Sequence, residues 1–569
     1  MYHELKEKNN GYNYWNGTEA AHRRVMMKAA GYSDEDIRQK PHIGIPNSYM
    51  AGSPGTAHLR QVTEAVKEGI WAAGGIPVEF GIPATCGNVA NGADEMKYEQ
   101  VGRDIVAMSI EFVSRIHNFD AICCVASCDL IIAGCYLAAC RLDIPALVVT
   151  GGSMQAGNYC GKTVVEADLD AARFSGASEA ELFEMEESVC PSFGACPSMG
   201  TANTMQMLGE VLNLVMPGTS TIPASDNARL RAARTAGKYM VQLARSGKTP
   251  KDLITKDVLE NAIMFDMAVA GSTNAVLHIL AYAYELGIKL TLADFEKYAK
   301  EIYCINAVIP SGPYTVVDFH YAGGVKQVMK QLAGKIHTDA PTIYGDTTWG
   351  ELLDSVKSAP NKVIHSLEDP VAKEPGLKIM RGNISPAGAI VRPTAVYEEV
   401  KYIKGAAKVY ECDQDAYRAI MAGEIVAGDI LVIRYEGCKG APGMKELMLS
   451  IDALIGLGLD KKVGLITDAR FSGFNYGAIV GHVSPEAYDG GVIALIENGD
   501  EIEMDIAGGT VNLLVSDEIL AERRKSWVRP PLKQQKGVLN IYAQNCRPAE
   551  EGGAMQPWAL DADYGYHHE

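Results

Sequence analysis

Three segments of the sequence carry residues that bind metals or transfer protons. The first is residues 127–129, where the thiol of Cys128 and the carboxylate of Asp129 are adjacent. A thiolate is a preferred ligand of iron, and a carboxylate is a preferred ligand of Mg²⁺. Because Cys-Asp is a common dipeptide, this segment indicates a metal site only in combination with the other two.

The second segment, residues 190–203 (CPSFGACPSMGTAN), is a loop rich in Gly and Ser that contains Cys190 and Cys196. The two thiols stand further apart in sequence than those of a zinc ribbon. The loop leads into a helix that we predict to begin near Thr201. Exposed N–H groups at such a helix start favour an anion, such as a cluster sulfide or a carboxylate.

The third segment is divided between residues 440–446 (GAPGMKE) and 467–473 (TDARFSG). It offers a carboxylate at Glu446 and a hydroxyl at Ser472. A serine works as a base only as the alkoxide, so it must lie beside a metal that lowers its pKa.

The first of these segments follows a predicted strand. Residues 121–126 and 146–150 are short apolar runs that predict buried strands, and residues 128–142 predict the helix between them. Further helices are predicted at residues 58–73 and 104–118. Strand–helix–strand order implies right-handed crossovers and a parallel sheet. Ligands bind beyond the carboxyl ends of such strands, where residues 127–129 are expected.

The pattern changes near residue 376. Short alternating or apolar runs separated by Gly, Asp and Asn predict strands. We therefore predict an α/β N-terminal domain with a parallel sheet (residues 1–375) and a C-terminal β-barrel domain (376–569). Residues 336–376 form the crossing, and residues 546–569 form an extension over the fold or over a partner subunit. The predicted strands are residues 408–410, 429–434, 463–467, 492–497, 501–505 and 510–515.

Composition narrows the classes of function. The 569 residues are 47% hydrophobic and 21% charged, as in globular proteins of more than one domain. A net charge of −18 argues against nucleic acid as a partner. The polar residues 1–14 lack a signal-peptide pattern and no long apolar run occurs, so we expect a cytoplasmic location and no membrane contact. Thirteen cysteines then predict reduced thiols, metal ligands or buried small hydrophobic residues rather than disulfides.

Taken in order, these segments resemble the dihydroxy-acid dehydratase / phosphogluconate and sugar-acid dehydratase family. The resemblance runs from about residue 21 to residue 527. Eight ordered stretches carry it: IGIPNSY (43–49), PGTAHLR (54–60), CDLIIAG (128–134), CPSFGACPSMGTANTM (190–205), AGSTNAVLH (270–278), GAPGMKE (440–446), ITDARFSG (466–473) and GHVSPEA (481–487).

The resemblance implies a hydro-lyase that dehydrates a 2,3-dihydroxy carboxylic acid or a sugar acid to a 2-keto acid, the former in amino-acid biosynthesis. It implies an iron–sulfur cluster ([2Fe–2S] or [4Fe–4S]), Mg²⁺, and a homodimer or homotetramer with the site between two domains. By position, Cys128 and Cys196 match cluster cysteines, and Asp129 and Glu446 match Mg²⁺ ligands. Ser472 matches the serine that acts as the base.

The chain departs from the family at three of these positions. Gly55 stands where many members have a third cluster cysteine, although some members also have Pro-Gly there. Gly87 replaces an aspartate that binds Mg²⁺, and Leu130 replaces a lysine that becomes a carbamylated Mg²⁺ ligand. Neither side chain coordinates a metal, so Asp129 and Glu446 alone would hold the cation weakly.

Two other thiols lie near these positions in the sequence. Cys86 precedes Gly87, and Cys438 stands where the family tends to have proline. One hypothesis is that both join Cys128 and Cys196 around the cluster. The alternative is that both are ordinary packing residues.

The departures leave two other functions open. The chain is then either a divergent enzyme that catalyses another reaction on a hydroxy acid, or a paralogue that binds a small acid or a subunit without catalysis. The substrate is also open, because Asn475 and Tyr476 stand where many relatives have Thr and Arg.

Overall fold

The computed structural model describes residues 14–357, 359–472 and 475–556. A four-stranded parallel sheet organises the N-terminal part, in the order β2 (Ile76–Gly81), β1 (His42–Asn47), β3 (Ala121–Ala126) and β4 (Ala146–Thr150). Every residue of β1, β3 and β4 is buried. This burial accounts for their continuous apolar sequences, because helices cover both faces of a parallel sheet.

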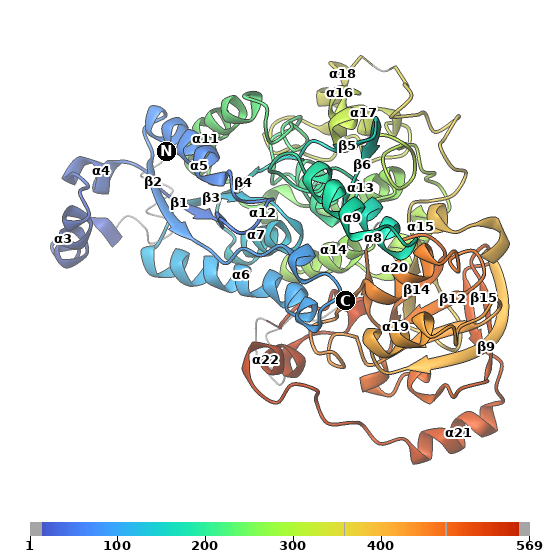
Figure 1. Cartoon of the computed structure of the whole chain (residues 1–569). Coiled ribbons are helices and arrows are strands. Elements are labelled where there is room, and N and C mark those ends of the chain that lie inside the picture. Colours follow the sequence, from blue (N-terminus) through green and yellow to red (C-terminus); the bar gives the residue numbers. More distant parts are fainter. Residues whose placement is uncertain (1–13, 358, 473–474, 557–569) are drawn as a thin grey trace.

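Helices cover this sheet on both sides (Figure 1). On one face α5 (Leu59–Ala72) and α11 (Ala228–Ser246) pack against Ile43, Cys123 and other strand residues that point the same way. On the other face, α6 (Tyr98–His117) and α7 (Asp129–Leu142) pack against the alternate strand residues. The α7 helix is apolar on nearly all sides because further helices enclose it, among them α10 (Thr201–Val211) and α14 (Asn274–Glu285).

Other helices complete this part of the molecule. They include α3 (Ala21–Ala29), α4 (Asp34–Gln39), α8 (Glu166–Phe174), α9 (Glu179–Val189), α13 (Lys256–Val269), α15 (Leu292–Tyr298), α16 (Val316–Tyr321), α17 (Gly324–Gln331) and α18 (Trp349–Asp354).

The C-terminal part is built on an eight-stranded sheet whose four middle strands are parallel. A bridge between Arg381 and Thr510 joins its two outer strands, so the sheet is nearly barrel-shaped. Helices α19 (Asp413–Met421) and α20 (Leu449–Gly456) cover it. The order is β16 (Thr510–Leu513), β15 (Glu501–Asp505), β9 (Tyr402–Tyr410), β10 (Ile430–Ile433), β12 (Gly464–Thr467), β14 (Ala478–Ser484), β8 (Gly388–Val391) and β7 (Lys378–Met380).

The predicted parallel N-terminal sheet and β-rich C-terminal part are confirmed. Strands 121–126, 146–150 and 501–505 have the predicted bounds. Two predictions are wrong. Residues 492–497 contain a 3₁₀ turn, Val492–Leu495, because a short buried apolar run does not distinguish a strand from a turn. Helix α6 begins at Tyr98 rather than at residue 104.

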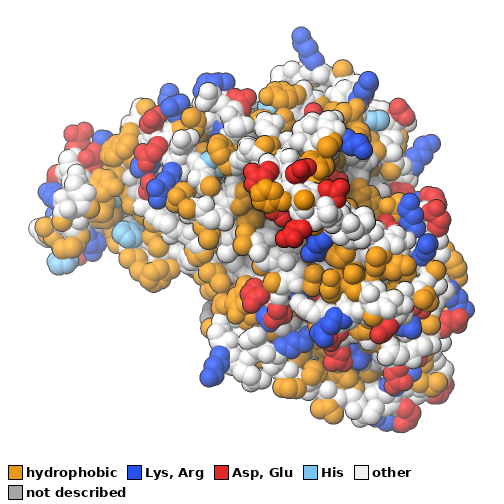
Figure 2. Space-filling view, in the orientation of Figure 1, with side chains coloured by type: hydrophobic (Ala, Val, Ile, Leu, Met, Phe, Trp, Pro, Cys, Tyr) orange, Lys and Arg blue, Asp and Glu red, His pale blue; other side chains and the backbone are white. Residues whose placement is uncertain are grey.

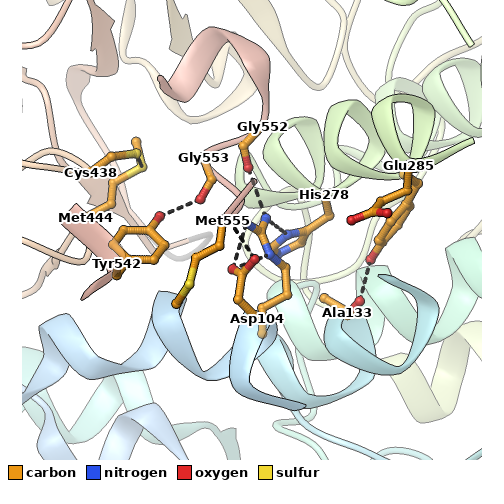
Figure 3. Close-up of polar contacts among 12 residues, drawn as sticks. Asp104, Ala133, His278, Glu285, Cys438, Met444, Tyr542, Gly552, Gly553 and Met555 are labelled. Carbon is orange, nitrogen blue, oxygen red and sulfur yellow. Dashed lines mark hydrogen bonds and ion pairs between the residues drawn. The ribbon is translucent and has the colours of Figure 1, made fainter. Parts of the chain in front are cut away.

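The described part of the predicted C-terminal extension lies over the fold. After α22 (Gly537–Asn545) the chain passes α6, where the Asp104 carboxylate accepts a hydrogen bond from the backbone N–H of Met555 at 2.8 Å (Figure 3). Arg103, which is fully buried, donates to the Gly552 carbonyl at 3.0 Å. No helix among residues 14–357, 359–472 and 475–556 has the length and apolar character that a membrane span requires.

Candidate active site

One pocket collects four of the five residues predicted to form the site. Asp129, Cys196, Glu446 and Ser472 all line it, and Asp129 is directly preceded by the fifth, Cys128. The space that atoms do not fill in and around this pocket, its open mouth included, is about 440 Å³.

The turn between β3 and α7 positions Cys128 and Asp129. Cys128 precedes the first residue of α7 with φ 73° and ψ 161°, a conformation that only glycine adopts without strain. The buried strand on one side and the buried helix on the other maintain this conformation. The sharp turn places the Asp129 carboxylate at the carboxyl edge of the sheet, as predicted.

The loop that carries Cys196 is fixed by hydrogen bonds from the surrounding segments. The side-chain amide of Asn203 donates to the carbonyls of Cys196 and Ser198 at 2.5 and 2.8 Å. The backbone N–H of Gly194 donates to the Pro54 carbonyl at 3.0 Å. Cys190, at the other end of the loop, is exposed and does not line the pocket.

His58, from the PGTAHLR segment, supports this loop. Its Nε2 donates to the Gly151 carbonyl at 2.9 Å, and its ring stacks on Phe193 with centroids 4.6 Å apart. Burial lowers the pKa of His58 to about 4. The imidazole is therefore neutral at pH 7 and holds the loop in place.

Three thiols converge beside the pocket. Cys86 and Cys128 are hydrogen-bonded to each other, and this bond lowers the pKa of Cys86. The same bond, followed by burial, raises the pKa of Cys128 well above its usual range. Burial and then the charges of Glu166 and Asp129 raise the pKa of Cys196. Soft sulfur donors gathered in this way fit an iron–sulfur cluster, which takes its cysteines as thiolates.

Cys438 does not belong to this group, so that half of the four-thiol hypothesis is wrong. It is buried in a separate apolar cluster with Met444, Tyr542 and Cys546. Its Sγ lies 3.6 Å from Sδ of Met444 (Figure 3). A Cβ built on Gly55, by contrast, would lie 3.1 Å from Sγ of Cys128. A cysteine at residue 55 would therefore lie beside Cys128. This chain has glycine there and so lacks that thiol.

Carboxylates from both parts of the molecule meet on the other side of the pocket. Strands β11 (Glu446–Leu447) and β13 (Arg470–Phe471) pair in parallel, which places Glu446 opposite Arg470. The Arg470 guanidinium, fully buried, lies 3.4 Å from Glu446 Oε2 and 2.9 Å from Oε2 of Glu99 on α6. Ser472 directly follows β13.

These carboxylates are crowded and desolvated. Burial, followed by the negative charges of Glu99 and Glu446, raises the pKa of Asp129 well above its usual range. Burial also raises the pKa of Glu446 to about 7, where Arg470 opposes the shift and Glu99 adds to it. When all three acids are ionised, one guanidinium leaves an excess of two negative charges. This donor set fits a hard divalent cation such as Mg²⁺.

Glu99 is an acidic residue of this pocket that the sequence did not identify. The helix was predicted to begin at residue 104, so Glu99 fell outside it, whereas in the structure it lies in the first turn of α6. Only 7% of it is exposed. An acid one turn into an amphipathic helix and on its buried face is the signal that would have identified it. Leu130 is buried in α7, as its apolar type predicts.

A tighter group of possible ligands lies elsewhere. Donor atoms of Asp257, Glu260 and His337 are within 4.8 Å of one another. Glu260 Oε2 already accepts from Tyr298 at 2.5 Å and faces His337 Nε2 at 2.6 Å. Asp257 is exposed, and these hydrogen bonds already account for the arrangement.

Comparisons with known proteins match nearly the whole chain. Residues 40–351 match the family described as dihydroxy-acid/6-phosphogluconate dehydratase N-terminal, and residues 362–553 match its C-terminal counterpart. Dihydroxy-acid dehydratases from Caldanaerobacter subterraneus and Pyrococcus abyssi are each 42% identical to it, over 546 and 547 residues. That of Ignicoccus hospitalis is 43% identical over 545 residues. Each alignment covers 95% of this chain and 98% of the relative.

Proposed function

The chain belongs to the dihydroxy-acid/6-phosphogluconate dehydratase family, and on this basis we propose that it dehydrates a 2,3-dihydroxy carboxylic acid or a sugar acid to a 2-keto acid. One observation supports this most strongly. The thiol side (Cys86, Cys128 and Cys196) and the carboxylate side (Asp129, Glu446 and Glu99) meet at one pocket: Cys196 and the three acids line it together with Ser472, and Cys86 and Cys128 lie beside it. Dehydration needs both sides at once, because one carbon loses a proton while its neighbour loses hydroxide.

The residues of the pocket divide this work. When bound, Mg²⁺ would supply Lewis acidity to the carboxylate and C2 hydroxyl of the substrate, and the cluster would supply it to the C3 hydroxyl. Asp129 and Glu446 would hold the cation, and Cys128 and Cys196 would hold the cluster. Ser472 takes the C2 proton as its alkoxide. The C3 hydroxyl leaves and takes that proton back from Ser472 to become water. The resulting enol then loses its hydroxyl proton and takes a solvent proton at C3 to become the 2-keto acid.

We further propose Cys86 as the third thiolate of the cluster. Its hydrogen bond to Cys128 supports this assignment, as does the absence of a side chain at Gly55. In anaerobically purified protein, Cys86→Ser should lose most of the iron and sulfide. Cys438→Ser is the matched control, since Cys438 is a buried thiol in the separate cluster with Met444, and it should keep both. Equal iron in the two variants would contradict the assignment.

The proposed reaction is tested with anaerobically purified protein, Mg²⁺ and a panel of 2,3-dihydroxy acids and sugar acids. The expected product is a 2-keto acid from at least one substrate, and Ser472→Ala should abolish its formation. Visible absorption of the same sample reports the cluster. A sample without this absorption that forms no keto acid from any substrate would contradict the proposal and favour a non-catalytic binding protein.

We propose that the chain works as a homodimer or homotetramer in the cytoplasm. Met108, Phe112 and Ile116 recur at every fourth residue of α6 and are 40%, 66% and 57% exposed. Figure 2 shows hydrophobic side chains gathered over the region of α6. Such an exposed apolar stripe, on the side of α6 away from the core, supports a contact with a second subunit. The thirteen free cysteines suit a reducing compartment. Sedimentation of Phe112→Lys should show dissociation, whereas Arg115→Ala on the same helix should not.

A further inference from the structure

The Glu99 carboxylate occupies the space that a side chain at residue 87 would enter. A Cβ built on Gly87 would lie 2.2 Å from Oε1 of Glu99 and 2.7 Å from its Cδ. Real atoms do not approach so closely, so a side chain at residue 87 would displace the Glu99 carboxylate from this position, which the flexible side chain of Glu99 permits. By resemblance, Gly87 is the position where the family has an aspartate that binds Mg²⁺. The sequence change at residue 87 and the placement of Glu99 are therefore linked.

Glu99 also has the surroundings of a ligand. It lines the pocket together with Asp129 and Glu446. The carboxyls of Glu99 and Glu446 lie within hydrogen-bonding reach of each other. Two carboxyls remain that close only if they share a proton or if a cation lies between them.

The Arg470 guanidinium does not satisfy both carboxylates. Its Nε donates to the Met444 carbonyl, and its two other nitrogens each face one oxygen, Oε2 of Glu99 and Oε2 of Glu446. The Oε1 atoms of both acids are left over from this contact. Arg470 therefore orients the two carboxylates, and its single charge leaves an excess of two negative charges when Glu99, Glu446 and Asp129 are all ionised.

A second observation points to a ligand at the same place. Ser198 lines the pocket and is fully buried, yet its Oγ has no hydrogen-bond partner within the described ranges. A buried hydroxyl without a partner is unfavourable by about 1–3 kcal/mol. A hydrated cation in the pocket would supply that partner through one of its water molecules.

We propose that Glu99 replaces the missing aspartate and completes, with Asp129 and Glu446, a three-carboxylate site for Mg²⁺. This inference deepens the proposed function, from which it takes the cation. The carboxylate has moved from the segment after β2 to the first turn of α6, twelve residues later, while its charge stays in the pocket. Glu99 thereby compensates for the aspartate that is missing at residue 87. Nothing compensates in this way for the lysine that is missing at residue 130.

The test measures Mn²⁺ binding by electron paramagnetic resonance, and Mg²⁺ by competition, on the anaerobically purified full chain without substrate. Glu99→Gln, which keeps the size of the side chain, should weaken Mn²⁺ binding at least about tenfold, or about 1.4 kcal/mol. Glu95→Gln is the matched control, since Glu95 is an exposed acid that precedes the same helix. It should bind Mn²⁺ as the wild type does.

The reciprocal variant returns the carboxylate to its family position. Gly87→Asp/Glu99→Ala should bind Mn²⁺ within about threefold of the wild type, a difference of about 0.7 kcal/mol. Gly87→Asp alone should not gain affinity, because the new carboxylate takes the place of Glu99 rather than adding to it. Unchanged Mn²⁺ binding by Glu99→Gln would overturn the inference. If that variant does not fold, failure of the double variant to bind overturns it. If the Mn²⁺ pattern holds but no substrate is dehydrated, the proposed function fails and the cation site stands.

Discussion

The two sides of the pocket have changed in different ways. On the thiol side, Cys128 and Cys196 keep the positions that the family motifs give them, and a thiol next to them in space, Cys86, lies against Cys128. On the carboxylate side, two expected ligands are replaced by Gly87 and Leu130, and an acid from the start of α6 enters the pocket. A motif search detects donors that keep their place in the sequence. A donor that arrives from another element is visible only in the structure.

The largest effect is expected on the thiol side. Cys128→Ser removes the thiol at the centre of the group formed with Cys86 and Cys196. Because partners outside the ligand shell already change metal affinity by about 10–100-fold, loss of a ligand should lower bound iron and activity by at least about 100-fold. Iron analysis and turnover of anaerobic samples measure this. Near-normal iron content would show that the three thiols do not act together.

Removing one charge from the carboxylate side should weaken cation binding and leave the cluster in place. Asp129→Asn keeps the shape of the side chain, so we expect the visible absorption of the cluster to remain while Mn²⁺ binding weakens about tenfold. Activity should fall further than binding, because the cation stabilises charge that develops during the reaction. If Asp129→Asn lost the cluster as well, the division of the pocket into two sides would be wrong.

A smaller effect is expected on the way in which the stability of the protein changes with pH. Burial holds the pKa of Glu446 at about 7, against an ordinary value of 4.5. Between these pH values the folded state keeps a proton that the unfolded state has released, so rising pH lowers the stability of the metal-free protein. In Glu446→Gln that contribution is absent, and the melting temperature should fall less between pH 5 and pH 8. The comparison is made with chelator present, since Mg²⁺ binds the ionised form and reverses the trend. Parallel curves for the two proteins would contradict the assignment.

The smallest effect is expected on the stability of the loop that carries Cys196. Asn203→Ala removes two hydrogen bonds to the carbonyls of Cys196 and Ser198, so we expect a loss of about 1–3 kcal/mol in the free energy of unfolding, measured with urea. Asn88 makes one weak contact to the loop, 3.5 Å to Sγ of Cys196, and Asn88→Ala should change stability by less than about 1 kcal/mol. Similar losses for both variants would show that the loop does not depend on Asn203.

Elements with an unambiguous pattern were predictable from the sequence. The strand at residues 121–126 is apolar throughout and enters a turn at Ser127, which fixed the place of Cys128 and Asp129 at the sheet edge. Glu446 and Ser472 were found through resemblance, since nothing local distinguishes them from turn residues. The structure brings them to Asp129 through the pairing of β11 with β13, which joins segments about 24 residues apart.

The rest was not predictable for physical reasons. The start of α6 lies in residues 98–103, where buried polar side chains such as Arg103 interrupt the apolar period, so Glu99 appeared to belong to a loop. Cys438 is close in sequence to Glu446, yet its thiol turns into an apolar cluster formed by the C-terminal segment. Long-range packing decides both positions, and the local residue pattern does not predict it.

The most direct test of the account is the reaction carried out in D₂O by anaerobically purified, Mg²⁺-loaded protein. Loss of the C2 proton, departure of the C3 hydroxyl and ketonisation of the enol would give a 2-keto acid with one solvent deuterium at C3, which mass spectrometry detects. We expect this product from at least one 2,3-dihydroxy acid or sugar acid, and its absence with Ser472→Ala. A keto acid without deuterium at C3, or no keto acid from a protein that retains its cluster and Mg²⁺, would contradict it.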